Sequence, residues 1–180
     1  MTALREAIAA AAATLAEAGV DSARTDAELL AAHLTGSERG RLALLDVQSP
    51  GFFERYDNAV KSRARRIPLQ HIIGTAAFGP VVLEVGPGVF IPRPETEAVL
   101  EWALGQRLPD QPLIVDLCTG SGALAVALAA CRPGARVVAV DDDPAALAYA
   151  RRNSAQTGVR VVAGDVTDPG LLSELAGAVD

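Results

Sequence analysis

The sequence predicts an α/β protein: a helical N-terminal region, then a β-hairpin, then the first half of a doubly wound parallel sheet. Three observations support this prediction. From Pro92 onward, continuous apolar runs alternate with helical patterns, which is typical of parallel strands covered on both faces. Residues 1–70 carry apolar residues at helical spacing only. Between these regions, glycines and prolines punctuate residues 71–92, as expected for a hairpin that links two domains.

The N-terminal region is predicted to contain four helices joined by short turns. They are expected up to Gly19, at 22–35, at 38–45, and from Pro50 to just before Pro68. In the last of these helices, Phe53, Tyr56 and Val60 are expected to form the apolar face. The alanine-rich first helix is bracketed by Glu6 and Glu17, so we interpret it as a retained amphipathic helix and not a signal peptide.

From residue 93 onward the pattern predicts alternating helices and strands. A helix begins near Pro94, with Trp102 at the spacing of a core residue. Strands are expected at 113–117, 136–140 and 159–163, and helices at 122–131 and 144–157. Right-handed crossovers between parallel strands then make this region the first half of a doubly wound fold.

Composition excludes several classes of function. The 180 residues carry a formal net charge of −6, which argues against a general nucleic-acid coat. Cys118 and Cys131 form no CxxC pair, and there are only 2 histidines, so neither a zinc site nor a disulfide framework is predicted. Reduced thiols indicate a cytoplasmic protein. No apolar run is long enough to span a bilayer.

The stretch VDLCTGSGA, residues 115–123, runs from the first predicted strand of the sheet into two glycines and then a helix. In doubly wound folds, ligands bind beyond the carboxyl ends of the strands. Glycines there allow a sharp turn and a close approach of a ligand to the backbone. The alternative interpretation is a tight turn that binds nothing.

Three acidic residues bear on which ligand this turn would bind. Asp141 ends the second strand, where a carboxylate can accept hydrogen bonds from both ribose hydroxyls of a nucleoside. The alternative role for Asp141 is to cap the helix that follows. We assign that capping role to Asp143 instead. Asp116 precedes the glycines, and an acid there suits a cationic ligand better than a pyrophosphate. Asp165 ends the third strand, where it can read an adenine amino group. Together they favour S-adenosylmethionine (SAM).

A nicotinamide cofactor remains an alternative, because Gly120, Gly122 and Ala125 also satisfy the G-x-G-x-x-A dinucleotide pattern. A second motif bears on the choice between SAM and a nicotinamide cofactor. Residues 90–97 read FIPRPETE, in which two prolines restrict the backbone around Arg93 before a helix begins. Residues 68–74 read PLQHIIG.

With these motifs, the chain resembles the HemK/PrmC-type protein-(glutamine-N5) methyltransferases, which modify peptide-chain release factors. The resemblance covers the whole chain, and FIPRPETE together with DLCTGSG, residues 116–122, carries it. It implies a class I SAM-methyltransferase fold, which is Rossmann-like. It also implies three parts: a helical release-factor-recognition domain at 1–70, a β-hairpin linker at 71–92 and an incomplete SAM-binding domain at 93–180.

The resemblance also implies roles for individual residues. The segment from Cys118 to Gly122 would line the methionine and ribose portion of SAM, Asp141 would hold the ribose hydroxyls, and Asp165 and Val166 would lie beside the adenine. Thr96 would help to close the pocket near the methyl donor. The implied cofactor-binding residues are therefore Thr96, Asp116, Cys118, Thr119, Gly120, Ser121, Gly122, Asp141, Asp165 and Val166. We assign no catalytic residue and no metal ligand.

The family places an Asn-Pro-Pro-Tyr motif after its fourth strand, and the 180 residues contain no such motif. We therefore expect these residues to be the N-terminal part of a longer methyltransferase and to be inactive alone. Release factor is the expected partner, with no membrane and no direct nucleic-acid binding. A nucleic-acid amine methyltransferase and a non-catalytic SAM-binding fragment remain alternatives.

Overall fold

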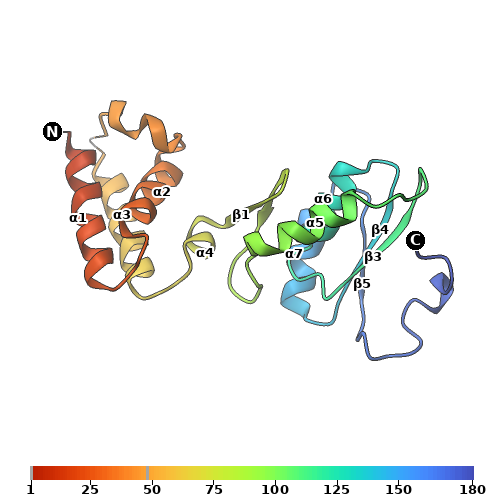
Figure 1. The fold of residues 1–180 in the computed structure, drawn as a ribbon. Helices are drawn as coiled ribbons and strands as arrows, with labels where there is room; N and C mark the ends of the chain where they lie inside the picture. Colours follow the sequence, from red (N-terminus) through yellow and green to blue (C-terminus); the bar gives the residue numbers. More distant parts are fainter. Residues whose placement is uncertain (1, 48) are drawn as a thin grey trace. The chain divides into compact units, whose positions relative to one another are not determined.

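The computed structural model describes residues 2–47 and 49–180. Residues 1 and 48, which fall inside the predicted helical region 1–70, lie outside the described residues. The chain divides into two compact units, Met1–Ile73 and Gly74–Asp180 (Figure 1). We refer to them as unit 1 and unit 2. The predicted division into 1–70, 71–92 and 93–180 stays a prediction about function.

In the described part of unit 1, residues 2–47 and 49–73, the regular elements are helices, as the spacing of its apolar residues predicts. Its helices are α1 (Ala3–Glu17), α2 (Ala23–Thr35), α3 (Pro50–Ala64) and α4 (Leu69–Ile73), with the 3₁₀ helix η1 (Arg39–Leu44) between α2 and α3. The short third helix is confirmed and is of the 3₁₀ type. One detail of the prediction is wrong: α3 buries Phe52, with Phe53 only partly buried. The short helix α4 was not predicted.

The core of unit 1 is held by apolar contacts and one buried hydroxyl. The Tyr56 hydroxyl donates to the carbonyl oxygen of Ala27 at 2.8 Å, and the Tyr56 ring stacks on Phe52 with ring centroids 5.8 Å apart. Burial raises the pKa of Tyr56 well above its usual range. Helix α2 ends at Gly36, whose φ of 63° is a left-handed conformation that glycine adopts without strain.

A buried ion pair ties α2 to α3. Asp26 is 4% exposed, and its carboxylate accepts from Arg63 Nε at 2.6 Å and from Ser22 Oγ at 2.8 Å. We predict that Arg63→Ala lowers the free energy of unfolding by about 3 kcal/mol, because the Asp26 carboxylate would stay buried without its cation. The measurement is urea unfolding. Lys61→Ala removes an exposed pair with Asp57 and is expected to change stability by less than about 0.5 kcal/mol. Equal losses in both variants would contradict this account.

Unit 2 begins with the predicted hairpin. Strands β1 (Thr75–Phe78) and β2 (Val81–Glu84) pair antiparallel, with Phe78 opposite Val81 at the turn. The hairpin is predicted to extend over 71–92, but residues 85–92 form no strand. Instead Val89 is buried against Ala76 and Val85, so its hydrophobicity reflects packing beneath the hairpin.

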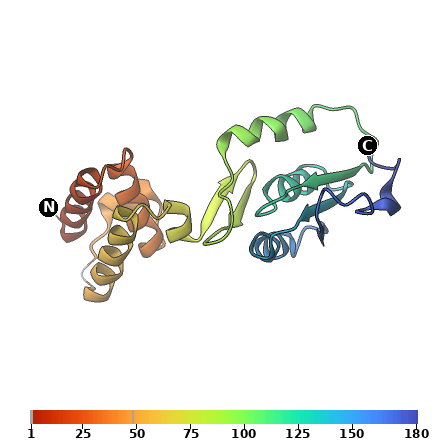
Figure 2. The same ribbon diagram turned by 90° about the horizontal axis from the view of Figure 1, so that it is seen from below.

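The rest of unit 2 is a three-stranded parallel sheet in the order β3-β4-β5, with helices along it (Figure 2). The strands are β3 (Leu113–Leu117), β4 (Arg136–Asp141) and β5 (Arg160–Ala163). The helices are α5 (Glu97–Leu104), which follows the 3₁₀ turn η2 (Pro94–Thr96), then α6 (Ala123–Cys131) and α7 (Pro144–Ser154). The predicted fold class is confirmed: a helical N-terminal part, a hairpin and a parallel sheet.

The central strand β4 has a continuously apolar sequence because both of its faces are covered. On one face, Val137 and Ala139 pack against Ala125 of α6. On the other face, Val138 and Val140 pack against leucines of the segment that follows β5. Since both faces are covered, no residue between Arg136 and Asp141 faces solvent, and alternation of apolar and polar residues is absent.

The prediction for Trp102 is wrong. Its side chain is 67% exposed, whereas Leu100 in the same helix is 4% exposed and packs against the hairpin and α6. Helix α5 has only 8 residues and buries a narrow stripe. Residues two positions apart point to nearly opposite sides of a helix, so Trp102 faces away when Leu100 faces inward.

Candidate functional site

A cavity of about 580 Å³ lies at the carboxyl ends of β3 and β4, within unit 2. It collects seven of the ten residues that the sequence predicts for the cofactor site: Thr96, Asp116, Cys118, Thr119, Gly120, Ser121 and Asp141. Its lining also includes Phe78, Gly88, Phe90, Pro92, Arg93, Leu117, Ala123, Leu124, Asp143 and Ala146. Residues far apart in the sequence therefore meet at the edge of the sheet where this fold class binds ligands.

The loop from β3 to α6 is held in a conformation that leaves its backbone open to the cavity. Cys118 has a φ of 59°, which is uncommon for a residue with a side chain, and Gly120 has the same φ. A Cβ on Gly120 would meet nothing within 4 Å, whereas one on Gly122 would meet the Ala150 Cα at 3.4 Å. The two glycines thus have different surroundings: Gly120 faces open space, whereas a Cβ on Gly122 would be in ordinary van der Waals contact with α7.

Asp116 is a largely buried acid at one side of this loop. Its carboxylate accepts a hydrogen bond from the Thr119 hydroxyl at 2.6 Å. Burial raises the pKa of Asp116, the nearby charge of Asp141 raises it further, and the Thr119 hydrogen bond partly opposes both effects. An acid in such a position gains most from a cationic ligand, because the ligand would offset the desolvation of the carboxylate.

Asp141 ends β4 and is fixed by two backbone N–H groups. One of its carboxylate oxygens accepts from the Gly120 N–H at 2.8 Å, and the other accepts from the Asp143 N–H at 3.1 Å. Each oxygen keeps a further lone pair for a ligand. Asp143 caps α7 by accepting from the N–H groups of Ala145 and Ala146, which confirms its predicted capping role.

The wall formed by FIPRPETE contributes residues that sequence reasoning did not assign individually. Phe90 and Arg93 both line the cavity, and the Arg93 guanidinium lies 4.9 Å from the centroid of the Phe90 ring. Phe78, at the end of β1, adds an apolar contact. The FIPRPETE motif indicated that residues 90–97 are functional. Phe78 and Gly88 belong to no motif, so the sequence alone could not assign them to the site.

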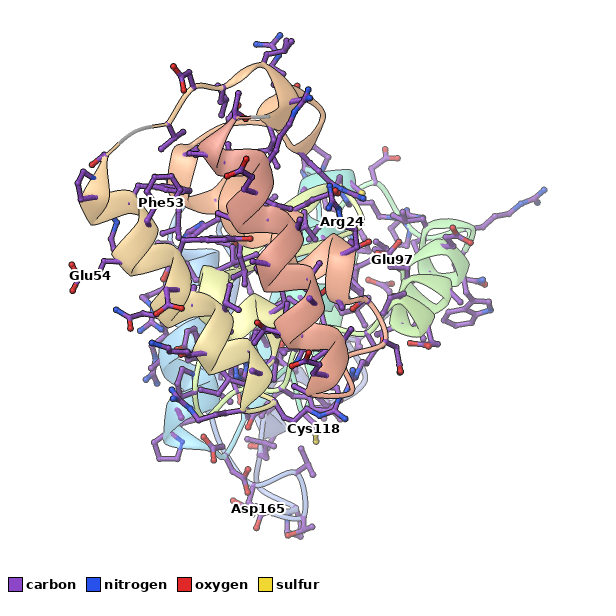
Figure 3. All side chains as sticks on the ribbon, turned by 90° about the vertical axis from the view of Figure 1, so that its left-hand side faces the viewer. Arg24, Phe53, Glu54, Glu97, Cys118 and Asp165 are labelled. Atoms are coloured by element: carbon purple, nitrogen blue, oxygen red, sulfur yellow. The ribbon has the colours of Figure 1, made fainter. Side chains whose placement is uncertain are left out.

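Three predicted site residues do not line the cavity: Gly122, Asp165 and Val166. Asp165 is exposed, as is Cys118 (Figure 3), and its carboxylate accepts from the hydroxyl of Thr167 at 2.7 Å and from its N–H at 2.8 Å. The hydroxyl bond chiefly lowers the pKa of Asp165. The preceding Gly164 donates its N–H to the carbonyl oxygen of Asp141 at 3.0 Å. Asp165 is therefore the next residue after one that contacts the end of β4. The adenine assignment of Asp165 and Val166 stays a prediction.

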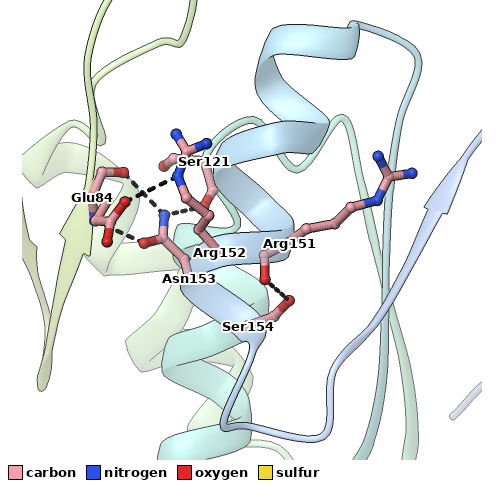
Figure 4. A network of polar contacts seen from close by, with 6 residues as sticks. All are labelled: Glu84, Ser121, Arg151, Arg152, Asn153 and Ser154. Carbon is pink, nitrogen blue, oxygen red and sulfur yellow. Dashed lines mark hydrogen bonds and ion pairs between the residues drawn. The ribbon is translucent and has the colours of Figure 1, made fainter.

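Asn153 of α7 links the hairpin to the glycine loop (Figure 4). Its amide Nδ2 donates to the Ser121 carbonyl at 2.8 Å and to the Glu84 carbonyl at 3.0 Å, while its Oδ1 accepts from the Glu84 N–H at 2.7 Å. Arg152 adds an ion pair with the Glu84 carboxylate at 2.9 Å. Sequence reasoning missed Asn153, because a lone asparagine near a helix end carries no distinctive pattern.

Within residues 2–47 and 49–180, no group of three or more histidine, cysteine, aspartate or glutamate side chains could hold a metal ion. No helix described there is long and apolar enough to cross a membrane. Both cysteines, Cys118 and Cys131, are free and exposed.

Known protein families match both units. Residues 6–74 match the PrmC N-terminal domain, and residues 114–179 match a methyltransferase domain. Release factor glutamine methyltransferases of Mycobacterium leprae and Mycolicibacterium smegmatis are each 64% identical over 100% of this chain. A 4-amino-L-phenylalanine/4-methylamino-L-phenylalanine methyltransferase of Streptomyces pristinaespiralis is 40% identical over 98% of the chain.

The chain spans only part of these relatives. It covers 62% of the Mycobacterium leprae protein, 64% of the Mycolicibacterium smegmatis protein and 62% of the Streptomyces pristinaespiralis protein. The matched segments place a PrmC N-terminal domain in unit 1 and part of a methyltransferase domain in unit 2. Both units of the chain are therefore similar to release factor glutamine methyltransferases.

Proposed function

We propose that the whole protein transfers a methyl group from SAM to the side-chain nitrogen of a glutamine in a peptide-chain release factor. The observation that carries this proposal is the cavity of unit 2, in which Asp116 and Asp141 lie at the ends of neighbouring strands around an open glycine loop. The identity of 64% to release factor glutamine methyltransferases supports the choice of substrate.

The lining of the cavity suits SAM. Three carboxylates, those of Asp116, Asp141 and Asp143, face one guanidinium, that of Arg93. SAM carries a sulfonium and an ammonium cation, and it supplies the methyl group when bound. Asp141 would accept from the ribose hydroxyls, and Asp116 would face the cationic end. A nicotinamide dinucleotide would instead bring a doubly charged pyrophosphate to this acidic lining, so we favour SAM over it.

The remaining assignments follow from the same proposal. The segment from Cys118 to Gly122 would contact the methionine and ribose portion, Thr96 would close the pocket near the methyl donor, and Asp165 and Val166 would contact the adenine. We assign residues 1–70 to release-factor recognition, 71–92 to the linker and 93–180 to SAM binding. The free thiols of the chain fit a location in the cytoplasm.

A glutamine amide nitrogen is a poor nucleophile, because its lone pair is delocalised into the carbonyl group. Methyl transfer to it therefore depends on orientation, with the nitrogen held in line with the methyl group. We propose that an Asn-Pro-Pro-Tyr motif of the whole protein holds the amide. That motif is not among these 180 residues, so they would bind the methyl donor without orienting the acceptor.

Transfer of labelled methyl groups tests this function. The full-length protein is incubated with methyl-labelled SAM and, in parallel, a release factor, double-stranded DNA and 4-amino-L-phenylalanine. The last acceptor is included because a 40% identical relative is named for it. We expect the label in the release factor, on a glutamine. Label in DNA or in the amino acid, with none in the release factor, would overturn the proposal.

Gly120→Ala tests whether the open side of the glycine loop receives the cofactor. The added methyl group meets no protein atom within 4 Å, so it would occupy space left for the ligand. We predict that SAM affinity, measured by calorimetry on this chain, falls at least about tenfold.

The matched control is Gly36→Ala in unit 1. Gly36 has a φ of 63°, close to the 59° of Gly120, and its added methyl group also meets nothing within 4 Å. Both variants should lose about 1 kcal/mol of stability, because both impose a left-handed conformation on alanine. Only Gly120→Ala should lose SAM affinity. An equal loss of affinity in the two variants would mean that general destabilisation is the cause.

A further inference from the structure

Unit 1 contains a second concave site that SAM binding does not use. It is a groove of about 710 Å³ between α1, α2 and η1. Its polar lining is formed by Arg5, Arg24, Arg39 and Glu28, and its floor by Ile8, Ala9, Gly40, Leu42 and Ala43. We call these residues the arginine groove. Arginines from three separate elements thus converge on one apolar floor.

Glu28 arranges two of these arginines. One of its carboxylate oxygens accepts from Arg24 Nε at 2.5 Å, and the other accepts from Arg39 Nε at 2.7 Å. The hydrogen bond from Arg39 chiefly lowers the pKa of Glu28, so its carboxylate stays ionised. Because both arginines use Nε, their terminal nitrogens have no hydrogen-bond partner within 2–47 and 49–180. Arg24, labelled in Figure 3, keeps 61% of its side chain exposed.

The positive charge of the groove is local. Three guanidinium groups face one carboxylate there. By contrast, residues 1–73 as a whole contain nine lysine and arginine residues and nine aspartate and glutamate residues. Such a balance provides no broad positive field of the kind that attracts a nucleic-acid backbone. The groove is therefore a local cationic site in a unit whose charges are otherwise balanced.

The apolar part of the groove points to a peptide. Its floor consists mainly of Ile8, Leu42 and Ala43, and the next residue, Leu44, is 84% exposed. Arginine pairs carboxylates with two parallel hydrogen bonds, and arginine is enriched among the residues that dominate protein–protein binding. We propose that the arginine groove binds an acidic segment of a partner protein in which carboxylates flank an apolar side chain.

This binding would be separate from the binding of SAM. It involves unit 1 alone, and it requires neither SAM nor the cavity of unit 2. A failure of SAM binding would therefore leave the arginine groove untouched, and a failure of peptide binding would leave SAM binding by unit 2 untouched. The two proposals can be tested on the same chain with independent readouts.

Fluorescence anisotropy of a labelled peptide tests the proposal. The peptide carries a leucine flanked on both sides by glutamates, and a second peptide carries glutamines in their place. We expect the acidic peptide to bind the 180-residue chain, with an affinity that falls as salt is added. Arg24→Ala and Arg39→Ala should each weaken binding at least about tenfold. Arg24→Lys, which keeps the charge but loses the forked donor, should give an intermediate loss.

Lys61→Ala is the matched control. Lys61 pairs with Asp57 at the same i,i+4 spacing as Arg24 with Glu28, its side chain is also 61% exposed, and it lies outside the groove. This variant should bind the acidic peptide like the unaltered chain. Three results would overturn the proposal: no binding of the acidic peptide, equal binding of the glutamine peptide, or an equal loss in Lys61→Ala. Displacement of the peptide by a DNA oligonucleotide that itself needs Arg24 and Arg39 would assign the groove to nucleic acid instead.

Discussion

Replacing Asp141 with alanine is expected to weaken SAM binding by about a hundredfold or more. Each hydrogen bond to a charged group contributes about 1.5–3 kcal/mol, and both ribose hydroxyls would lose their acceptor. The variant also leaves the Gly120 N–H, now 2.8 Å from the carboxylate, without its partner, so the glycine loop would lose an anchor. Calorimetric titration of this chain with SAM measures the effect.

The neighbouring Asp142 provides a matched control. It is exposed, it also carries one negative charge, and it does not line the cavity. Asp142→Ala therefore removes the same charge one residue away while leaving the strand end and the glycine loop intact. We expect SAM affinity within about twofold of the unaltered chain, since an exposed charge is screened by solvent and salt. Comparable losses in the two variants would assign the effect to net charge and contradict the ribose role.

Replacing Asp116 with asparagine is expected to weaken SAM binding about tenfold and, at the same time, to stabilise the fold at neutral pH. The carboxylate would be the partner of the cationic end of SAM, and its removal loses a charge-assisted contact. In the unliganded protein the same carboxylate is largely buried, and an ionised buried acid is unfavourable. Asparagine can still accept the hydrogen bond that Thr119 donates at 2.6 Å.

The stability of the protein should depend on pH in a way that this variant reveals. Because burial raises the pKa of Asp116 above that of the unfolded chain, which is about 3.9, the folded state binds the proton more tightly. The stabilisation that the protonated Asp116 side chain contributes is present below about pH 4 and is lost as the pH rises through the folded-state pKa. Asp116→Asn should remove that loss.

The comparison uses urea unfolding across this pH range for the unaltered chain, Asp116→Asn and Asp142→Asn. Relative to the unaltered chain, Asp116→Asn should become progressively more stable as the pH rises toward neutrality. Asp142→Asn, at an exposed position, should follow the unaltered chain. An Asp116→Asn variant that loses stability as the pH rises would show that the carboxylate is stabilised by its surroundings, contrary to the burial effect.

The sequence predicts the architecture of unit 2 well, for reasons that particular residues illustrate. Val137 to Val140 form a continuous apolar run because both faces of β4 are covered, and such a run signals a central parallel strand. Since strand ends meet at one edge of a parallel sheet, acids at the ends of β3 and β4 were expected to lie together. The structure brings Asp116 and Asp141 to one cavity.

Other features depend on contacts that no local pattern encodes. Trp102 follows the spacing of a core residue, yet α5 buries only the side that carries Leu100. Phe52 and Phe53 are adjacent, and only packing decides which of them enters the core. Asn153 joins two segments, Glu84 and Ser121, that lie far from it in the sequence. Such pairings depend on tertiary packing, which propensity and periodicity do not report.

Calorimetric titration of the 180-residue chain with SAM, with NAD in parallel, tests the central claim most directly, because the claim is that the acidic cavity of unit 2 binds a cationic methyl donor. We predict saturable binding of one SAM per chain and no detectable binding of NAD. Saturable binding of NAD without binding of SAM would contradict the account, because a pyrophosphate would then be tolerated beside Asp116 and Asp141.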